Sequence, residues 1–230
     1  PVDTGTPTET TTPADTGTPT NTYTITETPT ITPTATITQT PVITPLVLDD
    51  FEDGDYALLH FPADNVWGVR DDSSDGGISR IDEFIITAPP GAGSAYAVKL
   101  TGAVVCWPSN FGYIDLTATA KGPGGAATDI SGYTAMKIKA YLSLAGFPVA
   151  KLCAVFLNSS AGDTITYGFE PVSTMTEYSF PFSGFSVESG SLASCLENFN
   201  YIGIRLFVQG FADDSFAYTL YYDDVSFVHE

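Results

Sequence analysis

The chain has 230 residues and carries 27 acidic side chains against 8 Lys and Arg, which gives a net charge of −19. A surface this negative repels nucleic acid and anionic lipid, so we exclude both as partners. No apolar run approaches the roughly 18 to 20 residues that cross a bilayer, so we expect no membrane span. Hydrophobic residues are concentrated after Pro45, which predicts two parts: an N-terminal segment, residues 1–45, and one domain, residues 46–230.

Threonine dominates the first part in a strictly alternating pattern. It occupies 19 of the 21 even-numbered positions from Thr4 to Thr44. A strand sends successive side chains to opposite faces, whereas polyproline II repeats every three residues and would scatter these threonines. The pattern therefore predicts a long extended strand with a threonine face. The alternative is a solvated, mucin-like Thr/Pro linker, which the composition alone favours.

The opposite face of this predicted strand carries apolar side chains that we expect to mediate assembly: Tyr23, Ile25, Ile31, Ile37 and Ile43. Extended, the segment spans roughly 135 Å, whereas the following domain is only about 40 Å across. One domain cannot cover such a strand, so we expect it to lie along several copies of the same chain. Its prolines lack N–H groups, which predicts intermittent rather than continuous backbone pairing.

The threonine face also suits covalent modification, because secreted Thr/Pro segments are common O-glycan acceptors. Unmodified threonine remains the alternative, since threonine has good β propensity by itself. Asn158-Ser159-Ser160 is a single N-glycosylation sequon, which makes Asn158 a further candidate. The candidate O-glycosylated residues are Thr16, Thr18, Thr20, Thr22, Thr24, Thr26, Thr28, Thr30, Thr32, Thr34, Thr36, Thr38 and Thr40.

The second part consists of short runs of aromatic and β-branched residues separated by turn residues such as Gly122-Pro123-Gly124-Gly125. A helical pattern is confined to Ser191–Asn198. We therefore predict an all-β domain, a two-sheet jelly-roll sandwich. The predicted strands cover residues 46–51, 79–86, 96–101, 113–117, 135–142, 151–157, 164–169, 177–182, 202–208 and 218–228.

Four motifs in this domain follow the order found in jelly-roll carbohydrate-binding modules. They are Leu48-Asp49-Asp50-Phe51-Glu52-Asp53-Gly54-Asp55, Asn65-Val66-Trp67-Gly68, Asp129-Ile130-Ser131-Gly132-Tyr133 and Tyr221-Tyr222-Asp223-Asp224-Val225. Each motif alone is weak, but their common order makes residues 46–230 resemble family 11 and similar modules of secreted glycanases. The resemblance implies a jelly roll with a structural calcium ion and an extracellular or cell-surface location.

The same resemblance implies the calcium ligands. In such modules an acid of the first strand and the first Asp of the last-strand pair meet at the ion, which here would be Glu52 and Asp223. Calcium prefers several oxygen ligands, and Asp50 would project from the same strand face as Glu52, so Asp50 is a further candidate. The alternative is that acids at strand ends are solvated or cap turns. Asp71, Asp72 and Asp75 are better explained as turn residues.

Glycan-binding sheets place aromatic side chains against sugar C–H surfaces. Trp67, Tyr141, Tyr167 and Tyr221 could contribute, although the core is the expected place for each aromatic residue. Trp107 stands beside Pro108 in a predicted loop and is our candidate for polysaccharide contact.

Catalytic patterns are missing from the sequence. Only His60 and His229 are available for a Ser/His/Asp or Cys/His site, no Cys/His cluster has zinc spacing, and no carboxylate pair can be assigned. We therefore predict a non-enzyme. Cys106, Cys153 and Cys195 form an odd set that permits one disulfide, and Cys153, inside an apolar run, is predicted to be a core residue.

Three hypotheses for function follow. The first is an extracellular structural subunit whose N-terminal strand packs along neighbouring copies and builds a helical filament. The alternatives are a carbohydrate-binding module on an O-glycosylated linker, from a secreted glycanase, and a stalked surface adhesin. The alternation of threonine and isoleucine favours the filament, whereas the domain motifs favour the binding module.

Overall fold

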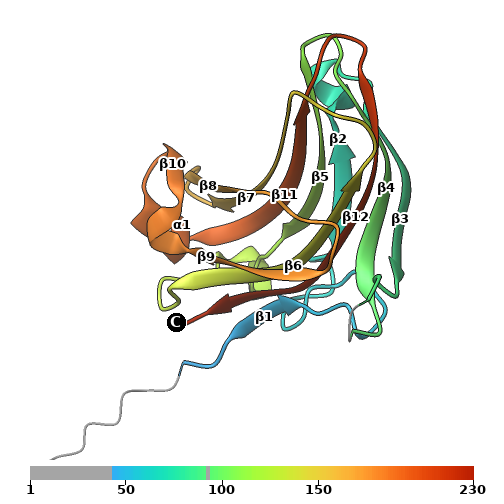
Figure 1. The fold of residues 1–230 in the computed structure, drawn as a ribbon. Coiled ribbons are helices and arrows are strands. Elements are labelled where there is room, and N and C mark those ends of the chain that lie inside the picture. Colours follow the sequence, from blue (N-terminus) through green and yellow to red (C-terminus); the bar gives the residue numbers. More distant parts are fainter. Residues whose placement is uncertain (1–42, 92–93) are drawn as a thin grey trace, which may run out of the picture. The chain divides into compact units, whose positions relative to one another are not determined.

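The computed structural model describes residues 43–91 and 94–230, which form twelve strands, one α-helix and three short 3-10 helices (Figure 1). The strands are β1 (Leu46–Asp49), β2 (Trp67–Asp71), β3 (Arg80–Thr87), β4 (Ala97–Val105), β5 (Phe111–Thr119), β6 (Ala135–Leu144), β7 (Ala150–Ser159), β8 (Thr164–Phe169), β9 (Thr176–Pro181), β10 (Ser186–Ser189), β11 (Phe199–Gln209) and β12 (Ser215–Val228). The helices are α1 (Leu192–Glu197), η1 (Asp72–Asp75), η2 (Pro123–Gly125) and η3 (Phe182–Gly184).

The strands form two antiparallel sheets. Sheet I has the order β3-β4-β12-β6-β9, and β1 pairs with the C-terminal part of β12. Sheet II has the order β10-β8-β7-β11-β5-β2. The two sheets pack face to face, which confirms the predicted jelly-roll β-sandwich. Among the described residues, no helix is long and apolar enough to cross a membrane.

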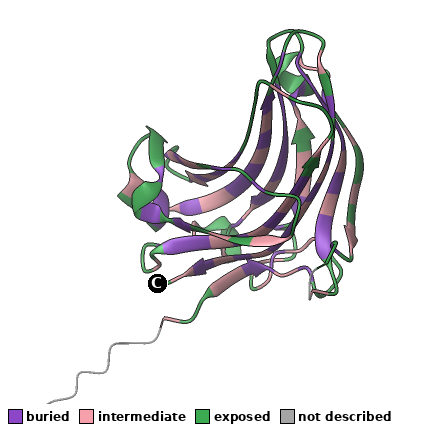
Figure 2. Ribbon diagram, viewed as in Figure 1, coloured by how far each residue is buried: buried purple, intermediate pink, exposed green. Residues whose placement is uncertain are grey.

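Alternation of apolar and polar residues builds the core between the sheets. In β11, Ile202, Ile204, Leu206 and Val208 are completely buried, and the residues between them point to the other side of the sheet. Figure 2 shows the same alternation of buried and more exposed residues along the strands of both sheets. Hydrophobic burial on the inner faces therefore holds the sandwich together and leaves the outer faces available for other roles.

The sandwich is bent. In Figure 1 the strands of both sheets change direction along their length, and sheet II lies on the inner side of the bend. We call the outer face of sheet II, on this inner side of the bend, the trough. The outer face of sheet II is therefore concave, whereas the outer face of sheet I is convex.

All ten predicted strands are present, with ends that differ by a few residues, and the predicted helix corresponds to α1. The first strand is shorter than predicted. It ends at Asp49, and Phe51 has a left-handed backbone with φ +55°, which a strand does not allow. Two strands, β2 and β10, were not predicted. β2 is a short edge strand that contains a glycine, and all four residues of β10 are exposed, so neither has an apolar pattern.

All three cysteines are buried and unpaired, so the disulfide that the sequence permits does not form. Cys153 is a core residue, as predicted. Burial raises the pKa of its thiol to about 12, which keeps the sulfur protonated and unreactive. The described residues, 43–91 and 94–230, belong to one compact unit. The predicted boundary at residue 45 stays a prediction, because residues 1–42 lie outside the described part of the chain.

Candidate functional site

The outer face of sheet II is the candidate functional site, and strand register fixes which side chains share it. Residues directly opposite each other in neighbouring strands point to the same face. Arg205 of β11 lies opposite Asp115 of β5, and Asp115 lies opposite Arg70 of β2. On the other side, Arg205 lies opposite Ala154 of β7, which lies opposite Gly168 of β8. These five residues form one row across the sheet, which we call the central row.

An ion-pair network occupies one half of the central row. Asp115 Oδ1 and Oδ2 accept hydrogen bonds from Arg205 Nε at 2.7 Å and Nη2 at 2.8 Å, a bidentate arrangement. Arg70 Nη2 lies 3.5 Å from Asp115 Oδ2. The Asp115 side chain is only 1% exposed, whereas those of Arg205 and Arg70 are 31% and 54% exposed. The hydrogen bonds to Asp115 raise the pKa of Arg205 above its ordinary value, so the guanidinium stays charged.

Tyr113 lies beneath this network and supports it. The Arg205 guanidinium carbon is 3.9 Å from the centre of the Tyr113 ring, and that of Arg70 is 5.8 Å away. The Tyr113 hydroxyl donates a hydrogen bond to Asp75 at the end of η1. Because Tyr113 and Asp115 are buried under the two arginines, the arginines present the polar surface of the trough.

Aromatic pairs flank the central row on both sides. On one side, Phe111 of β5 stacks on Phe207 of β11, with ring centres 5.3 Å apart and planes inclined by 28°. On the other side, Phe156 of β7 packs against Tyr201 of β11 at 6.0 Å and 34°. Phe207 and Tyr201 are six residues apart in one strand, which corresponds to roughly 20 Å. The trough therefore has a charged floor between two aromatic walls.

A glycine makes room for one of these walls. Gly203 lies opposite Phe156 in the sheet, and an added Cβ would lie 2.0 Å from the Phe156 ring. The tip of the ring thus lies close over the Gly203 backbone. Phe156 also lies 5.6 Å from the Arg205 guanidinium carbon. Glycine at position 203 is therefore required for the position of the ring beside the charged floor.

Trp107 lies near the Phe111 end of this face, where it lines a pocket of about 130 Å³. Its side chain is half-exposed, as a sugar-contacting residue requires. The pocket is lined by Trp107, Phe111, Tyr113, Pro108, Ser109, Asp72, Asp75 and Gly77. The structure thus places the predicted contact residue next to the aromatic wall, and its role in binding stays a prediction.

The other aromatic candidates lie elsewhere. Trp67 is a core residue whose indole N–H donates to the buried carboxylate of Asp49 at 2.8 Å. Tyr167 packs against Phe180 and Phe185, with ring centres 5.2 and 5.3 Å away. Tyr141 and Tyr221 form an edge-to-face pair on the outer face of sheet I. None of these four contributes to the trough.

Sequence reasoning missed the residues of the trough: Arg205, Asp115, Arg70, Phe207, Phe111, Phe156 and Tyr201. A signal was present, because Tyr201, Gly203, Arg205, Phe207 and Gln209 alternate with the apolar core residues of one strand. Alternation alone does not show which strands pair with this one. It therefore does not show that these residues lie beside Asp115 and Phe156. The pairing of β11 with β5 and β7 supplies that information.

The predicted calcium ligands lie where β1 ends beside β12. Glu52 Oε1 accepts a hydrogen bond from the Ala95 backbone N–H at 3.0 Å, and Asp223 Oδ2 accepts one from the Ser94 hydroxyl at 2.6 Å. Both acids therefore contact the same short segment. Burial raises the pKa of Asp223 to about 6. The idea that Asp50 and Glu52 share one face of a strand is wrong, because β1 ends at Asp49 and both residues follow it in a turn.

These residues fit calcium in the kind of atom they offer but fall short in number. Calcium takes six to eight oxygen ligands, and Glu52, Asp223 and the Ser94 hydroxyl are oxygen donors. Asp50 Oδ1 instead accepts a hydrogen bond from the Glu52 backbone at 3.2 Å. Within residues 43–91 and 94–230, no three His, Cys, Asp or Glu side chains form a group that could hold a metal ion. Calcium binding therefore stays a prediction.

The modification and assembly candidates are mostly outside the described residues. Thr16 to Thr40 and Tyr23, Ile25, Ile31 and Ile37 belong to residues 1–42, and their roles stay predictions. Ile43 is half-buried just before β1. Asn158 lies within β7, opposite Tyr201, and its side-chain oxygen is buried without a hydrogen-bond partner among the described residues.

Comparisons with known proteins identify structural neighbours only. No model of a known protein family matches the chain, and no curated protein matches it significantly. The family 11 carbohydrate-binding module of the cellulosomal cellulase Lic26A-Cel5E of Clostridium thermocellum is 15% identical, covers 83% of this chain and 97% of that module, and gives a TM-score of 0.50. A family 11 module from the same organism, in complex with a β-1,3-1,4-mixed-linked tetrasaccharide, is 14% identical over 82% and 98% of the two chains, with a TM-score of 0.51.

A family 30 carbohydrate-binding module is also similar, at 9% identity, with 82% of this chain and 100% of that chain covered and a TM-score of 0.50. At such identities the likeness establishes the fold alone. The expected resemblance to jelly-roll binding modules is thus confirmed at the level of architecture. The described part of this chain has the β-sandwich fold of carbohydrate-binding modules.

Proposed function

We propose that this protein is a non-catalytic carbohydrate-binding module of the extracellular space, and that the trough on sheet II binds a neutral β-linked glucan. The observation that carries the proposal is the position of two aromatic walls on either side of the exposed Arg205 and Arg70. The structural neighbours, which are carbohydrate-binding modules, support this alternative over the filament hypothesis. The filament hypothesis depends on residues 1–42 and stays a prediction.

The trough offers both kinds of contact that a sugar ring needs. The C–H faces of a sugar pack on aromatic rings, and its hydroxyl groups require hydrogen-bond partners. Arg205 uses Nε and Nη2 for Asp115, and its Nη1 takes part in no hydrogen bond among the described residues. Arg70 is more than half exposed. These guanidinium groups can donate to hydroxyl oxygens between the two walls.

The charges of the site favour a neutral ligand. Arg205 and Arg70 are matched by Asp115 and Asp75, so the network carries no net charge, while the whole chain carries −19. An acidic polysaccharide would meet long-range repulsion without a local excess of positive charge. The mixed-linked tetrasaccharide bound by one structural neighbour is therefore a suitable first probe.

Binding rather than hydrolysis agrees with the state of the two acids beside the arginines, Asp115 and Asp75. Glycoside hydrolysis uses two carboxyl groups that flank the scissile bond, one of which donates a proton. Here Asp115 is buried in a bidentate ion pair, and Asp75 accepts a hydrogen bond from Tyr113. Neither is free to act on a substrate in the trough, which supports the proposed non-catalytic role.

The decisive experiment is calorimetric titration of the full chain with β-1,3-1,4-glucan, comparing wild type with Phe207→Ala. Loss of one stacked aromatic side chain should weaken binding at least tenfold, because aromatic anchors dominate such sites. Tyr141→Ala is the matched control. It removes an aromatic residue from an equally paired position on the outer face of sheet I and should leave the affinity unchanged. Absence of wild-type binding, or equal binding by Phe207→Ala, would contradict the proposal.

A further inference from the structure

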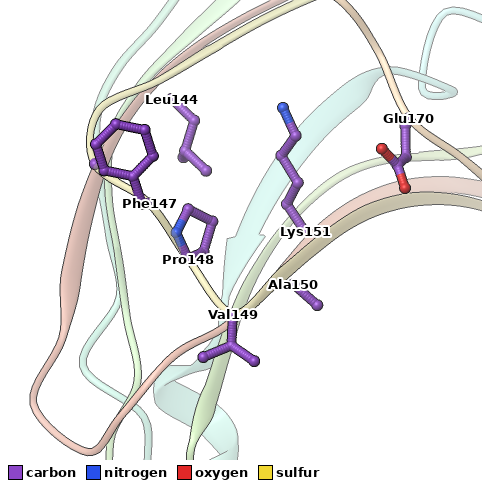
Figure 3. Close-up of a pocket in the computed structure, with 8 residues that line it drawn as sticks. Leu144, Phe147, Pro148, Val149, Ala150, Lys151 and Glu170 are labelled. Carbon is purple, nitrogen blue, oxygen red and sulfur yellow. The ribbon is translucent and has the colours of Figure 1, made fainter.

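A second open surface adjoins the candidate trough where β6 connects to β7. Two cavities, of about 550 and 490 Å³, share Leu144, Lys151 and Glu170 and so form one continuous groove. Figure 3 shows the residues that line the first of them. The β6–β7 loop contributes Phe147, Pro148 and Val149 to it. The loop that follows β8 contributes Pro171, Val172 and Ser173. We call this surface the β6–β7 groove.

The groove begins where one aromatic wall of the trough ends. Leu152 lies opposite Phe207 in the sheet, and the two preceding residues, Lys151 and Ala150, lie opposite Val208 and Gln209. Both of these β7 residues line the groove. Lys151 lies opposite the core residue Val208, so its side chain points to the inner side of sheet II, away from the trough, and the groove opens at the edge of the sandwich. Because β8 pairs with β7 only from Cys153 onward, Leu152 lies at this edge. A chain that crosses sheet II along the Phe111–Phe207 wall would pass over Leu152 and turn around the edge to reach the groove.

Apolar side chains around the groove are unusually exposed. Phe147 is fully exposed, Val149 is 63% exposed, and Val172 is 51% exposed. Large apolar residues that gather on a surface beside polar groups indicate a binding site. A purely apolar partner would leave the charged groups of the groove without a binding partner. A sugar ring can contact the apolar side chains with its C–H faces and the charged groups with its hydroxyl groups.

The polar groups of the groove are available for hydroxyl groups. In Figure 3 the side chain of Lys151 lies between Leu144 and Phe147 on one side and Glu170 on the other. Lys151 and Glu170 take part in none of the ion pairs found among the described residues. Lys151 offers a hydrogen-bond donor and Glu170 a hydrogen-bond acceptor, and apolar side chains lie beside both.

One wall of the groove is preformed. The Val172 N–H donates to the Tyr178 hydroxyl at 3.1 Å, and the Val172 carbonyl accepts from the Leu142 N–H at 3.0 Å. These bonds fix the loop after β8 to β9 and β6. Ligand binding therefore does not have to order this loop, and the smaller loss of conformational entropy favours affinity.

We infer that the β6–β7 groove is an extension subsite, so that the protein binds the interior of a long neutral glucan chain and not only a segment the length of the trough. This inference rests on the proposed function. It assigns the chain path across the strands, along the Phe111–Phe207 wall, over Leu152 and around the edge of β7 to Lys151. Oligosaccharides that reach the groove should therefore bind more tightly than those that fill the trough alone.

The test is calorimetric titration of the full chain with β-1,3-1,4-linked tetra-, hexa- and octasaccharides. Wild type should gain at least tenfold in affinity between the tetrasaccharide and the octasaccharide. Phe147→Ala and Lys151→Ala should lose most of that gain and bind the tetrasaccharide as wild type does. Because Phe147 is fully exposed, its substitution should not disturb folding. Ile85→Ala, which removes an exposed apolar side chain from sheet I, is the control and should keep the gain.

The outcomes separate this inference from the proposed function. If wild type does not bind the tetrasaccharide, the proposed function is contradicted and the inference falls with it. If the tetrasaccharide binds and longer chains bind no better, only the extension subsite is overturned. The extension subsite is also overturned if Phe147→Ala and Lys151→Ala both keep the full gain in affinity for the octasaccharide.

Discussion

At the scale of single residues, the site depends on groups that the ligand would not touch. Asp115 is buried beneath two arginines, and Gly203 lies beneath the Phe156 ring. Their residue types give no indication of binding in the sequence. An aspartate and a glycine are both common in β-strands. Only the pairing of β5, β11 and β7 shows that Asp115 orients Arg205 and that Gly203 leaves room for an aromatic ring.

Gly203→Ala should displace the Phe156 ring, because the new methyl group would overlap it. We expect a loss of about 1–3 kcal/mol in unfolding free energy from overpacking, together with weaker glucan binding. Denaturant unfolding and calorimetric titration measure the two effects. Gly132→Ala is the control, since an added Cβ there meets nothing within 4 Å. If Gly203→Ala binds like wild type, the Phe156 wall has no role in binding.

Asp115→Asn should leave two arginines without their shared buried partner. Removal of one member of a fully buried ion pair costs about 3–5 kcal/mol. The remaining arginines are 31% and 54% exposed, so solvent screening reduces the expected cost to about 1–3 kcal/mol. Arg205 would also lose the bidentate bonds that orient it. We expect a large fall in unfolding free energy and in glucan affinity. Asp82→Asn breaks the exposed Arg80–Asp82 pair and should cost less than about 1 kcal/mol. Equal stability of the two variants would show that Asp115 is not a supporting residue.

At the scale of elements, most of the strands can be predicted from the sequence. Period-two alternation in β6, β11 and β12 predicts these strands, because each has one face in the core. The edge strands β2 and β10 lack this pattern, since little of their surface is buried. The sequence predicted Trp107 near the site but not the trough. Trough residues lie on an outer face, where no burial pattern constrains residue type.

The junction of β1 with β12 allows a test of the calcium prediction. Glu52 and Asp223 both contact residues 94–96, so an ion between them would join three segments. We expect calcium to raise the melting temperature and a chelator to lower it. An ion present at 100 times its dissociation constant contributes about 2.7 kcal/mol. Differential scanning calorimetry measures the shift.

The double variant Glu52→Gln, Asp223→Asn should abolish the calcium response. Asp129→Asn is a control, because Asp129 caps the exposed turn at Ser131 and lies in a different motif. A wild-type melting temperature that does not depend on calcium would refute the prediction that these acids bind the ion.

At the scale of the whole molecule, the chain combines a described sandwich with an N-terminal segment of very different composition. Two of the three hypotheses, the binding module and the filament, assign these parts different importance. The binding module needs only the sandwich, whereas the filament needs the alternating residues before it. Both can be tested on one truncated protein, because β1 begins at Leu46 and pairs with β12.

Deletion of residues 1–42 should leave glucan affinity unchanged, because the trough lies entirely on sheet II. Calorimetric titration compares the truncated chain with the full chain. A tenfold loss would show that the N-terminal segment contributes to binding. Electron microscopy of both proteins addresses assembly separately: fibres formed only by the full chain would support the filament hypothesis, and isolated particles from both would reject it.

The alternation within sheet II has a consequence for how such a protein changes over time. Each strand carries stability on its inner side and, under the proposed function, ligand contacts on its outer side, so most positions serve one of these purposes and not the other. If the trough binds glycans as proposed, substitutions of Phe207, Tyr201 or Arg70 can alter which glycan is preferred while the core packing persists. A new preference could therefore be acquired one strand at a time. Asp115 and Gly203 are the exceptions, and they should limit how far the site can diverge.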